Sequence, residues 1–330
     1  MATIQDVAKA AKVSVATVSR VLNNSPSVSE KKQQVVMRAI QELNYQPNLL
    51  GRNLRRTETK MILVLVPTIF NTFYAKVVKG IEDIGNENGY NVMLCNTYAE
   101  KNREQVFLKQ LKNRLVDGII FMATGLSKEA LNEINQHFPI VQCCEYIKGA
   151  NLSRISIDNY AAAYKAVTHL IRQGRKRIAM ISSLNKLAST VEREAGYKKA
   201  LENAGIAIEP DIILPGDYGF KSGLRAARQL LTKEFNIDGI FAISDMMAIG
   251  AMKTIKENGL SVPEDIAVVG FDDIRYTSMC EPQLTTISQP QYDLGCGAMT
   301  LLLKRIQNEK ADIEHIVLEH ELMIRGSTVI

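Results

Sequence analysis

Apolar residues at helical spacing fill the first part of the chain. One group is Val7, Ala8 and Ala11, and a second is Val18, Val21 and Leu22. Thr3 with Asp6 comes close to a capping box, and Ser14 suits the N-cap of a following helix. We therefore expect one helix that begins after Thr3, a tight turn, and a second helix over residues 15–22.

A third apolar group predicts a helix from Ser29 to the residues before Pro47, since proline disfavours helical geometry at the preceding residue. Its core-facing members are expected to be Val35, Val36, Ala39, Ile40 and Leu43. Residues 46–59 then form either a hinge helix or a plain linker. This segment is too short for a stable isolated helix, and Gly51 weakens it by ~1 kcal/mol.

From residue 61 onward, short apolar runs alternate with stretches of helical spacing. Strands are expected over residues 61–66, 91–95, 118–122, 177–182, 240–243 and 266–271, and helices over residues 74–88 and 103–115. This alternation is typical of parallel α/β sheets. Residues 116–121 are echoed by residues 237–242, which indicates two similar halves.

The predicted fold class is therefore α/β, with an N-terminal all-α helix-turn-helix headpiece and two doubly wound parallel-sheet lobes. We expect a headpiece over residues 1–45, a hinge helix or linker over 46–59, and a two-lobe core over 60–330. Doubly wound lobes place a ligand cleft at the carboxyl ends of their strands.

Positive charge is concentrated at the start of the chain. Residues 1–60 hold ten Lys and Arg against four Asp and Glu, about +6, whereas the whole chain carries +5. A small basic helix-turn-helix unit suits duplex DNA. The second helix leaves Val15, Ala16, Thr17 and Arg20 to face outward, where the apolar pair suits thymine methyl groups and the arginine a guanine edge or a phosphate. The alternative is a small helical bundle with an incidental basic face.

In the segment after the headpiece, Leu54 would wedge into a minor groove while Arg55 and Arg56 contact phosphates. Elsewhere no run of 18 apolar residues occurs, and the N-terminus lacks the basic-then-apolar pattern of a signal peptide. The five scattered cysteines fit a reduced cytosol better than a disulfide framework or a metal site. We expect a cytoplasmic protein with no membrane span, metal or cofactor.

Polar and aromatic residues that follow predicted strands are the candidates for the cleft. They are Phe70, Phe73, Tyr74, Arg193, Tyr218, Ser244, Asp245, Asp272 and Asp273. Carboxylate and guanidinium groups hydrogen-bond hydroxyls, and aromatic rings stack on an apolar ring face, so the set suits a sugar or a nucleoside. Taken singly, each residue has an ordinary alternative as a helix cap, a turn residue or part of the core.

The sequence lacks the usual catalytic motifs. No phosphate loop, dinucleotide-binding glycine motif, Gly-x-Ser-x-Gly elbow or His-Glu-x-x-His motif is present. His169 and His320 fit structural positions better than reactive ones. We therefore do not expect an enzyme. One alternative is a solute-binding protein for transport, which the basic headpiece disfavours. The other is a sugar- or nucleoside-processing enzyme, which the missing motifs disfavour.

The chain resembles the lactose-repressor/galactose-repressor (LacI/GalR) family over essentially its full length. The motifs are Thr3-Ile4-x-Asp6-Val7-Ala8, Val13-Ser14-x-x-Thr17-Val18-Ser19-Arg20-Val21-Leu22-Asn23, Tyr45-x-Pro47-Asn48, Asp117-Gly118-Ile119-Ile120, Gly270-Phe271-Asp272-Asp273 and Leu284-Thr285-Thr286-Ile287. The resemblance implies a homodimeric repressor on two-fold symmetric operator DNA, with a core like a periplasmic sugar-binding protein. A small effector in the cleft would control it, or alternatively a protein coregulator such as a phosphorylated carrier protein. Inducer and corepressor action both stay open, and the lack of a C-terminal leucine heptad favours a dimer over a tetramer.

The resemblance also implies roles for single residues. It puts Val15, Ala16 and Arg20 in the major groove, Ser14, Thr17 and Tyr45 at phosphates, and Leu54 at the central minor-groove step. It puts Tyr74, Arg193, Tyr218, Ser244 and Asp272 at the effector. Three positions depart from the family pattern: Lys12 replaces a turn glycine, Cys144 an acid of the cleft, and Ser244 an asparagine. Lys12 at positive φ would be strained, whereas the other two changes are compatible with a nucleoside.

Overall fold

The structure is a computed structural model that describes residues 2–22, 25–45, 58–185, 187–233, 235–308 and 310–329. The chain divides into two compact units, Met1–Glu58 and Thr59–Ile330. Most of the expected hinge segment, residues 46–57, lies outside the described residues, and Leu54, Arg55 and Arg56 lie there with it. The two units are described separately below.

The described residues of the first unit form three helices, α1 (Ile4–Ala10), α2 (Val15–Leu22) and α3 (Glu30–Glu42). The capping box is present, because the Thr3 side chain accepts from the Asp6 amide and the Asp6 carboxylate accepts from the Thr3 amide. The core contains Val7, Ala8, Ala11, Val18, Val21, Val28, Val36 and Ala39. Two predicted core residues are wrong: Val35 is 45% exposed and Leu43, the C-cap of α3, is 37% exposed, since the buried side of α3 is formed by Val36 and Ala39.

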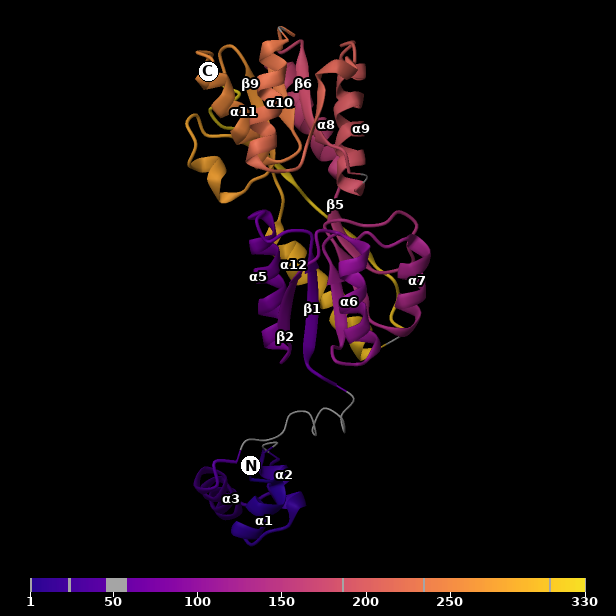
Figure 1. Ribbon diagram of the computed structural model, residues 1–330, viewed down its shortest axis with the longest axis vertical. Helices are drawn as coiled ribbons and strands as arrows, with labels where there is room; N and C mark the ends of the chain where they lie inside the picture. Colours follow the sequence, from indigo (N-terminus) through magenta and orange to yellow (C-terminus); the bar gives the residue numbers. More distant parts are fainter. Residues whose placement is uncertain are drawn as a thin grey trace. The chain divides into compact units, whose positions relative to one another are not determined.

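The second unit consists of two lobes, each built on a six-stranded sheet (Figure 1). In lobe 1 the strand order is β11-β5-β4-β3-β1-β2, and all neighbouring strands are parallel. Its strands are β1 (Met61–Val66), β2 (Asn91–Asn96), β3 (Gly118–Phe121), β4 (Ile140–Cys143), β5 (Arg154–Ile157) and β11 (His315–Leu318). Its helices are α5 (Phe73–Glu87), α6 (Lys101–Lys112), α7 (Lys128–His137) and α12 (Gln291–Gln307).

Strand β1 explains why lobe 1 has helices on both faces. Its residues Ile62 and Val64 pack with α5 and α12, whereas Leu63 and Leu65 pack with α6 and α7. A strand buried on both faces reads as a continuous apolar run, which is the pattern of residues 61–66.

In lobe 2 the strand order is β12-β10-β9-β8-β6-β7, parallel except for the antiparallel edge strand β12. The strands are β6 (Ile178–Ser183), β7 (Ile213–Gly216), β8 (Gly239–Ala242), β9 (Ala267–Asp272), β10 (Thr285–Ser288) and β12 (Glu321–Met323). The helices are α8 (Asn159–Arg172), α9 (Ala188–Asn203), α10 (Phe220–Thr232) and α11 (Asp245–Glu257), with short 3₁₀ turns η1 (Pro210–Ile212) and η2 (Arg275–Ser278). The α/β prediction with a helical headpiece and two parallel-sheet lobes is confirmed.

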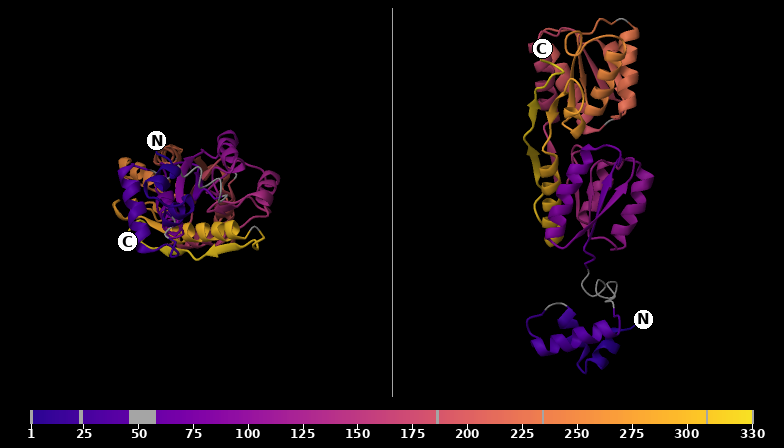
Figure 2. Two further views of the ribbon diagram at one scale, coloured as in Figure 1. Left: turned by 90° about the horizontal axis from the view of Figure 1, so that it is seen from below. Right: turned by 90° about the vertical axis from the view of Figure 1, so that its left-hand side faces the viewer.

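The chain crosses between the lobes three times, after β5, between β10 and α12, and between β11 and β12 (Figure 2). Strands β5 and β10 end at crossovers and run parallel to their neighbours. The carboxyl ends of the parallel strands in both sheets therefore face the region between the lobes, where doubly wound folds bind ligands.

Candidate functional sites

Helix α2 presents an exposed face beside the headpiece core. Val15 is 40% exposed, and Ala16 and Arg20 are exposed as well. Ser14 Oγ accepts a hydrogen bond from the Thr17 amide at 3.2 Å and shares one with Thr17 Oγ1 at 2.9 Å. These bonds cap a free backbone N–H group at the start of α2 and so fix the first turn, which carries outward-facing residues.

Tyr45 is half-buried and packs against the headpiece core. Lys12, in the turn between α1 and α2, adopts the left-handed region at φ 51°. This is the conformation that the departure from glycine predicted, and it is strained for a residue with a side chain.

In the second unit, Arg193 of α9 is buried beside the carboxyl ends of β8 and β9. It is 5% exposed. Its Nε donates to Asn159 Oδ1 at 2.9 Å and its Nη1 to the Ile243 carbonyl at 2.7 Å. The guanidinium carbon lies 3.6 Å from the centre of the Phe271 ring, and Nη1 lies 3.8 Å from Asp272 Oδ1. The cation is therefore held on three sides by polar atoms and on one face by an aromatic ring.

Asp272, at the end of β9, is also 5% exposed. Its Oδ1 accepts from Gln289 Nε2 at 2.7 Å, and its backbone carbonyl accepts from Gln291 Nε2 at 2.5 Å. Burial raises the pKa of Asp272 from 3.8 to about 7, against the lowering effect of Arg193 and Gln289. This carboxyl group can therefore change its protonation near neutral pH.

Tyr218 and Ser244 belong to the same wall of the site. The Tyr218 hydroxyl shares a hydrogen bond with Thr190 Oγ1 at 2.6 Å. Ser244 is the N-cap of α11, since its Oγ accepts from the Met247 amide at 3.4 Å, and it also donates to the Tyr218 carbonyl at 3.2 Å. The hydroxyl of Ser244 is thus engaged within lobe 2, as its helix-capping alternative predicted.

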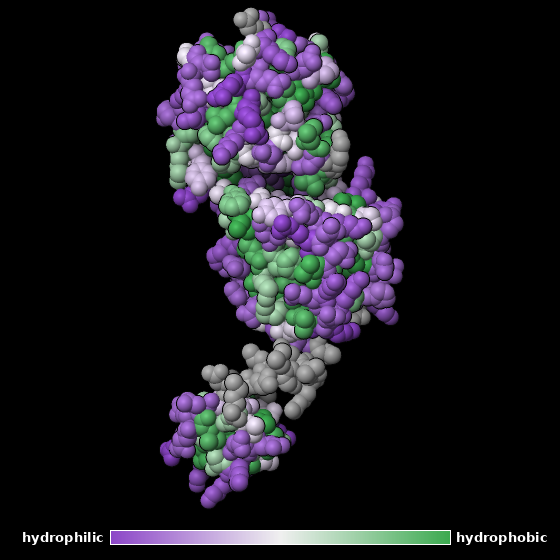
Figure 3. All heavy atoms as spheres, in the orientation of Figure 1, coloured by the Kyte–Doolittle hydropathy of each residue, from purple (hydrophilic) through white to green (hydrophobic). Residues whose placement is uncertain are grey.

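Lobe 1 contributes Tyr74, Cys144 and Glu145 to this region. Burial raises the pKa of Tyr74, and the negative charges of Glu145 and Asp272 raise it further, so groups from both lobes act on one phenol. Glu145 accepts a hydrogen bond from the Ser189 amide at 3.1 Å and another from the Ser189 hydroxyl. This contact closes lobe 1 against lobe 2, and Figure 3 shows the narrow indentation between them.

Four other residues that the sequence predicted for the cleft are in the core, on the surface or bonded to other partners. Phe73 is 5% exposed in the lobe 1 core and supports Tyr74 edge-on at 5.3 Å between ring centres. Phe70 is 83% exposed. Asp245 is buried and accepts from Thr286 Oγ1 at 2.5 Å. Asp273 accepts from Arg325 Nη2 at 2.8 Å.

The sequence analysis missed several residues that complete the site. They are Asn159, Ser189, Thr190, Gln289 and Gln291, all buried. Asn159 follows β5, and both glutamines follow β10, so the ends of strands were the signal that could have found them. Ser189 and Thr190 lie in the first turn of α9 and carried no such signal.

Four residues in this region have a positive φ. Cys144, Tyr218 and Asp272 have φ values of 69°, 64° and 115°, and Asp273 follows at 54°. Residues with side chains rarely adopt positive φ, and such strained positions gather at functional sites. All four lie at or just beyond the carboxyl ends of strands.

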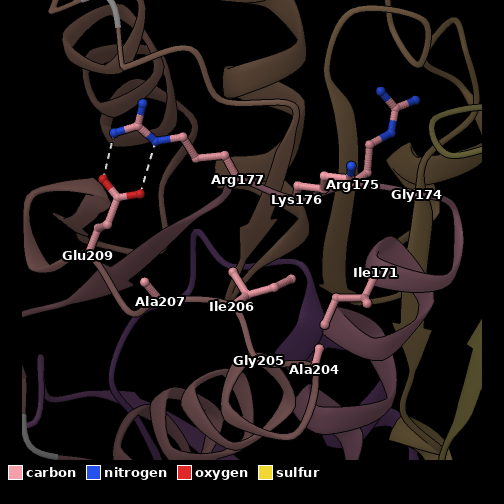
Figure 4. A pocket seen from close by; sticks show the side chains of 10 residues that line it. All are labelled: Ile171, Gly174, Arg175, Lys176, Arg177, Ala204, Gly205, Ile206, Ala207 and Glu209. Carbon is pink, nitrogen blue, oxygen red and sulfur yellow. Dashed lines mark hydrogen bonds and ion pairs between the residues drawn. The ribbon is translucent and has the colours of Figure 1, made fainter.

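Two surface hollows, of about 560 and 580 Å³, lie elsewhere on lobe 2. The first is lined by residues of the turns after α8 and α9, with Arg177 paired to Glu209 at its side (Figure 4). Neither contains a residue of the site between the lobes. Among the described residues, no helix is long and apolar enough to cross a membrane.

Comparisons with known proteins relate both units of the chain to characterised families. Residues 3–48 match the model of bacterial regulatory proteins of the lacI family, and residues 167–328 match a periplasmic binding protein-like domain. The HTH-type transcriptional regulator RegA of Clostridium saccharobutylicum is 39% identical, over 99% of this chain and 99% of its own. The HTH-type transcriptional repressor CytR of Escherichia coli K12 is 38% identical, over 99% of this chain and 96% of its own.

Solved structures give the same result. The lac repressor dimer bound to operator and the anti-inducer ONPF has a TM-score of 0.89 at 27% identity, covering 100% of this chain and 99% of that chain. The complex of the transcriptional regulator CelR with cellobiose has a TM-score of 0.76 at 31% identity, covering 99% and 100%. Residues 51–53, 62–67 and 321–328 resemble the cytidine repressor. The chain belongs to the lacI family of bacterial regulatory proteins and is a transcriptional repressor with a DNA-binding headpiece and an effector-binding core.

Proposed function

We propose that a small polyhydroxylated effector, a nucleoside or a sugar, binds between the lobes and controls the affinity of a homodimer for two-fold symmetric operator DNA. The observation that carries this proposal is the convergence of Tyr74 and Glu145 from lobe 1 with Arg193, Tyr218 and Asp272 from lobe 2. The protein would act in the cytoplasm as a regulator without enzymatic activity, as its relatives are regulators.

The chemistry of these side chains fits such an effector. The carboxylates of Glu145 and Asp272 accept hydrogen bonds from hydroxyl groups, and the guanidinium of Arg193 donates to ring or carbonyl oxygens. The ring of Tyr74 supplies an apolar face. CelR is described in complex with cellobiose, which supports a polyhydroxylated ligand for this fold.

The hydrogen bonds of Arg193 and Asp272 suggest how an effector would control the protein. Arg193 bonds to Asn159 on the first crossover, and Asp272 bonds to Gln289 and Gln291 on the second. An effector that competes for Arg193, Asp272 or the Glu145–Ser189 contact would therefore change the angle between the lobes. Coupling between effector and operator must be reciprocal, so operator DNA changes effector affinity by the same factor.

For DNA binding we propose the three parts expected from the sequence, residues 1–45, 46–59 and 60–330. The proposed operator contacts are Ser14, Val15, Ala16, Thr17, Arg20 and Tyr45 of the headpiece, with Leu54 and Arg55 of the linker. The homodimer is supported by the lac repressor dimer and by apolar residues on the edge strand β2, where Met93 and Leu94 are 43% and 45% exposed.

A thermal-shift screen of the purified protein against nucleosides, pentoses, hexoses and disaccharides tests the effector. A ligand at a hundred times its dissociation constant adds about 2.7 kcal/mol to the free energy of unfolding. We expect cytidine or a related compound to stabilise the wild type and Glu209→Ala, whose carboxylate lies outside the cleft, but neither Arg193→Ala nor Asp272→Ala. Stabilisation of all four proteins would contradict this site. If no compound acts, the alternative of a protein coregulator is favoured.

A further inference from the structure

The carboxylate of Asp117, just before β3, binds the two residues that lead into β1. Its Oδ1 accepts from the Thr59 amide and the Thr59 hydroxyl, both at 2.8 Å. Its Oδ2 accepts from the Lys60 amide at 2.8 Å. Thr59 is the first residue of the second unit, so this carboxylate holds the chain where it enters lobe 1 from the linker.

Further contacts fix the same two residues. The Lys60 carbonyl accepts from the Asn91 amide at 2.8 Å, and Lys60 Nζ lies 4.2 Å from the centre of the Tyr90 ring. Thr59 Oγ1 accepts from the Met61 amide at 3.2 Å. Lys60 has a φ of 56°, a conformation that a lysine keeps only when its surroundings determine it strongly. The direction of the chain at this point is therefore set by several independent bonds.

Lobe 2 contains a simpler version of this arrangement. Asp238 accepts from the Lys176 amide at 2.7 Å and from the Arg177 amide at 2.8 Å, at the start of β6 (Figure 4 shows both cations). This explains the sequence echo between residues 116–121 and 237–242. The lobe 2 version lacks a bond from a side-chain hydroxyl, and the strand register places Arg175 where lobe 1 has Thr59.

We propose that Asp117 is a positioning residue for DNA recognition, which fixes the point and direction at which the linker leaves lobe 1. A fixed exit keeps the two linkers of a dimer at one separation, and so restricts the spacing between half-sites that both headpieces can contact together. This inference rests on the dimeric operator binding proposed above. The inference requires that the carboxylate of Asp117 does more than stabilise lobe 1. The carboxylate of Asp238 makes similar bonds in lobe 2 and therefore serves as the control for a role in stability alone.

The test measures spacing preference with the full-length protein. The probe is a duplex selected by the wild type from a random-sequence library, together with two variants that have one central base pair inserted or removed. We expect Asp117→Asn to reduce the ratio of affinities between the selected and altered spacings about fivefold or more. Asp238→Asn removes the matching carboxylate in lobe 2, and we expect the wild-type ratio with a similar loss of thermal stability.

The possible outcomes are distinct. An unchanged ratio in Asp117→Asn, or an equal loss in both variants, overturns the inference and leaves the proposed function standing. A wild type without any spacing preference overturns dimeric operator binding and the inference with it. If Asp117→Asn does not fold, Thr59→Val removes one of the three bonds and must reduce the ratio, while Thr59→Ser must restore it.

Discussion

Single residues at the cleft combine binding chemistry with unusual electrostatics. Arg193 and Asp272 are both nearly inaccessible and their nearest charged atoms are 3.8 Å apart, longer than a direct hydrogen bond. Each instead bonds to neutral groups, Arg193 to Asn159 and Asp272 to Gln289. The attraction between the two charges therefore does not fully offset the burial of the carboxylate, which is why its pKa rises to about 7.

This pKa predicts how the stability of the unliganded protein depends on pH. Well below pH 4 the carboxyl is protonated in both the folded and the unfolded state. Between pH 4 and about 7 only the unfolded chain loses the proton, so the free energy of unfolding falls as pH rises and levels off above 7. Asp272→Asn lacks this component, and we expect its stability relative to the wild type to increase between pH 5 and pH 8 in urea unfolding. The exposed control Asp211→Asn should follow the wild type, and parallel profiles for Asp272→Asn would contradict the shift.

At the scale of elements, sequence patterns located most helices and strands but not every end. Residues 61–66 match β1, because the apolar run is bounded by Lys60 and Pro67 and buried on both faces. The predicted helix over residues 103–115 is displaced, since α6 runs Lys101–Lys112. Leu115, which extended the apolar pattern, is 55% exposed after a turn.

The site was less predictable than the elements that carry it. Tyr74, Arg193, Tyr218 and Asp272 were expected from strand ends and family motifs, and they converge in space. The pairing of Glu145 with Ser189 joins residues from different lobes, and a contact of this kind leaves no periodic pattern in the sequence. The positive φ at Cys144 and Tyr218 was equally invisible, because neither residue type marks such a conformation.

The turn between α1 and α2 gives a prediction about headpiece stability. Lys12 has a φ of 51°, which a residue with a Cβ adopts at a cost of about 1 kcal/mol relative to glycine. We expect Lys12→Gly to raise the thermal stability of the headpiece above that of Lys12→Ala, which loses the same charge but keeps the strain. Calorimetry of the full-length variants, following the headpiece transition, measures this difference. Equal stability of the glycine and alanine variants would mean that the turn stores no such strain.

At the scale of the whole core, the two lobes are joined by covalent crossovers and by contacts at the site. Arg193 and Asp272 connect the site to the first two crossovers through Asn159, Gln289 and Gln291. Glu145–Ser189 and Tyr146–Glu192 are hydrogen bonds that cross directly from lobe 1 to lobe 2. The direct contacts between the lobes therefore include these polar pairs and the apolar residues Ile274 and Met246 of lobe 2, which pack with the lobe 1 core.

The Glu145 carboxylate accepts two of the hydrogen bonds that cross directly between the lobes. Glu145→Ala leaves the Ser189 amide without its acceptor, so we expect hydrogen exchange at the start of α9 to become faster in the unliganded protein. Exchange in the buried strand β8 should stay unchanged, which separates opening of the lobes from general loss of stability. The control Glu209→Ala removes a carboxylate of similar charge that pairs with Arg177 within lobe 2, and it should leave exchange in α9 as in the wild type. Unchanged exchange at Ser189 in Glu145→Ala would show that closure does not depend on this carboxylate.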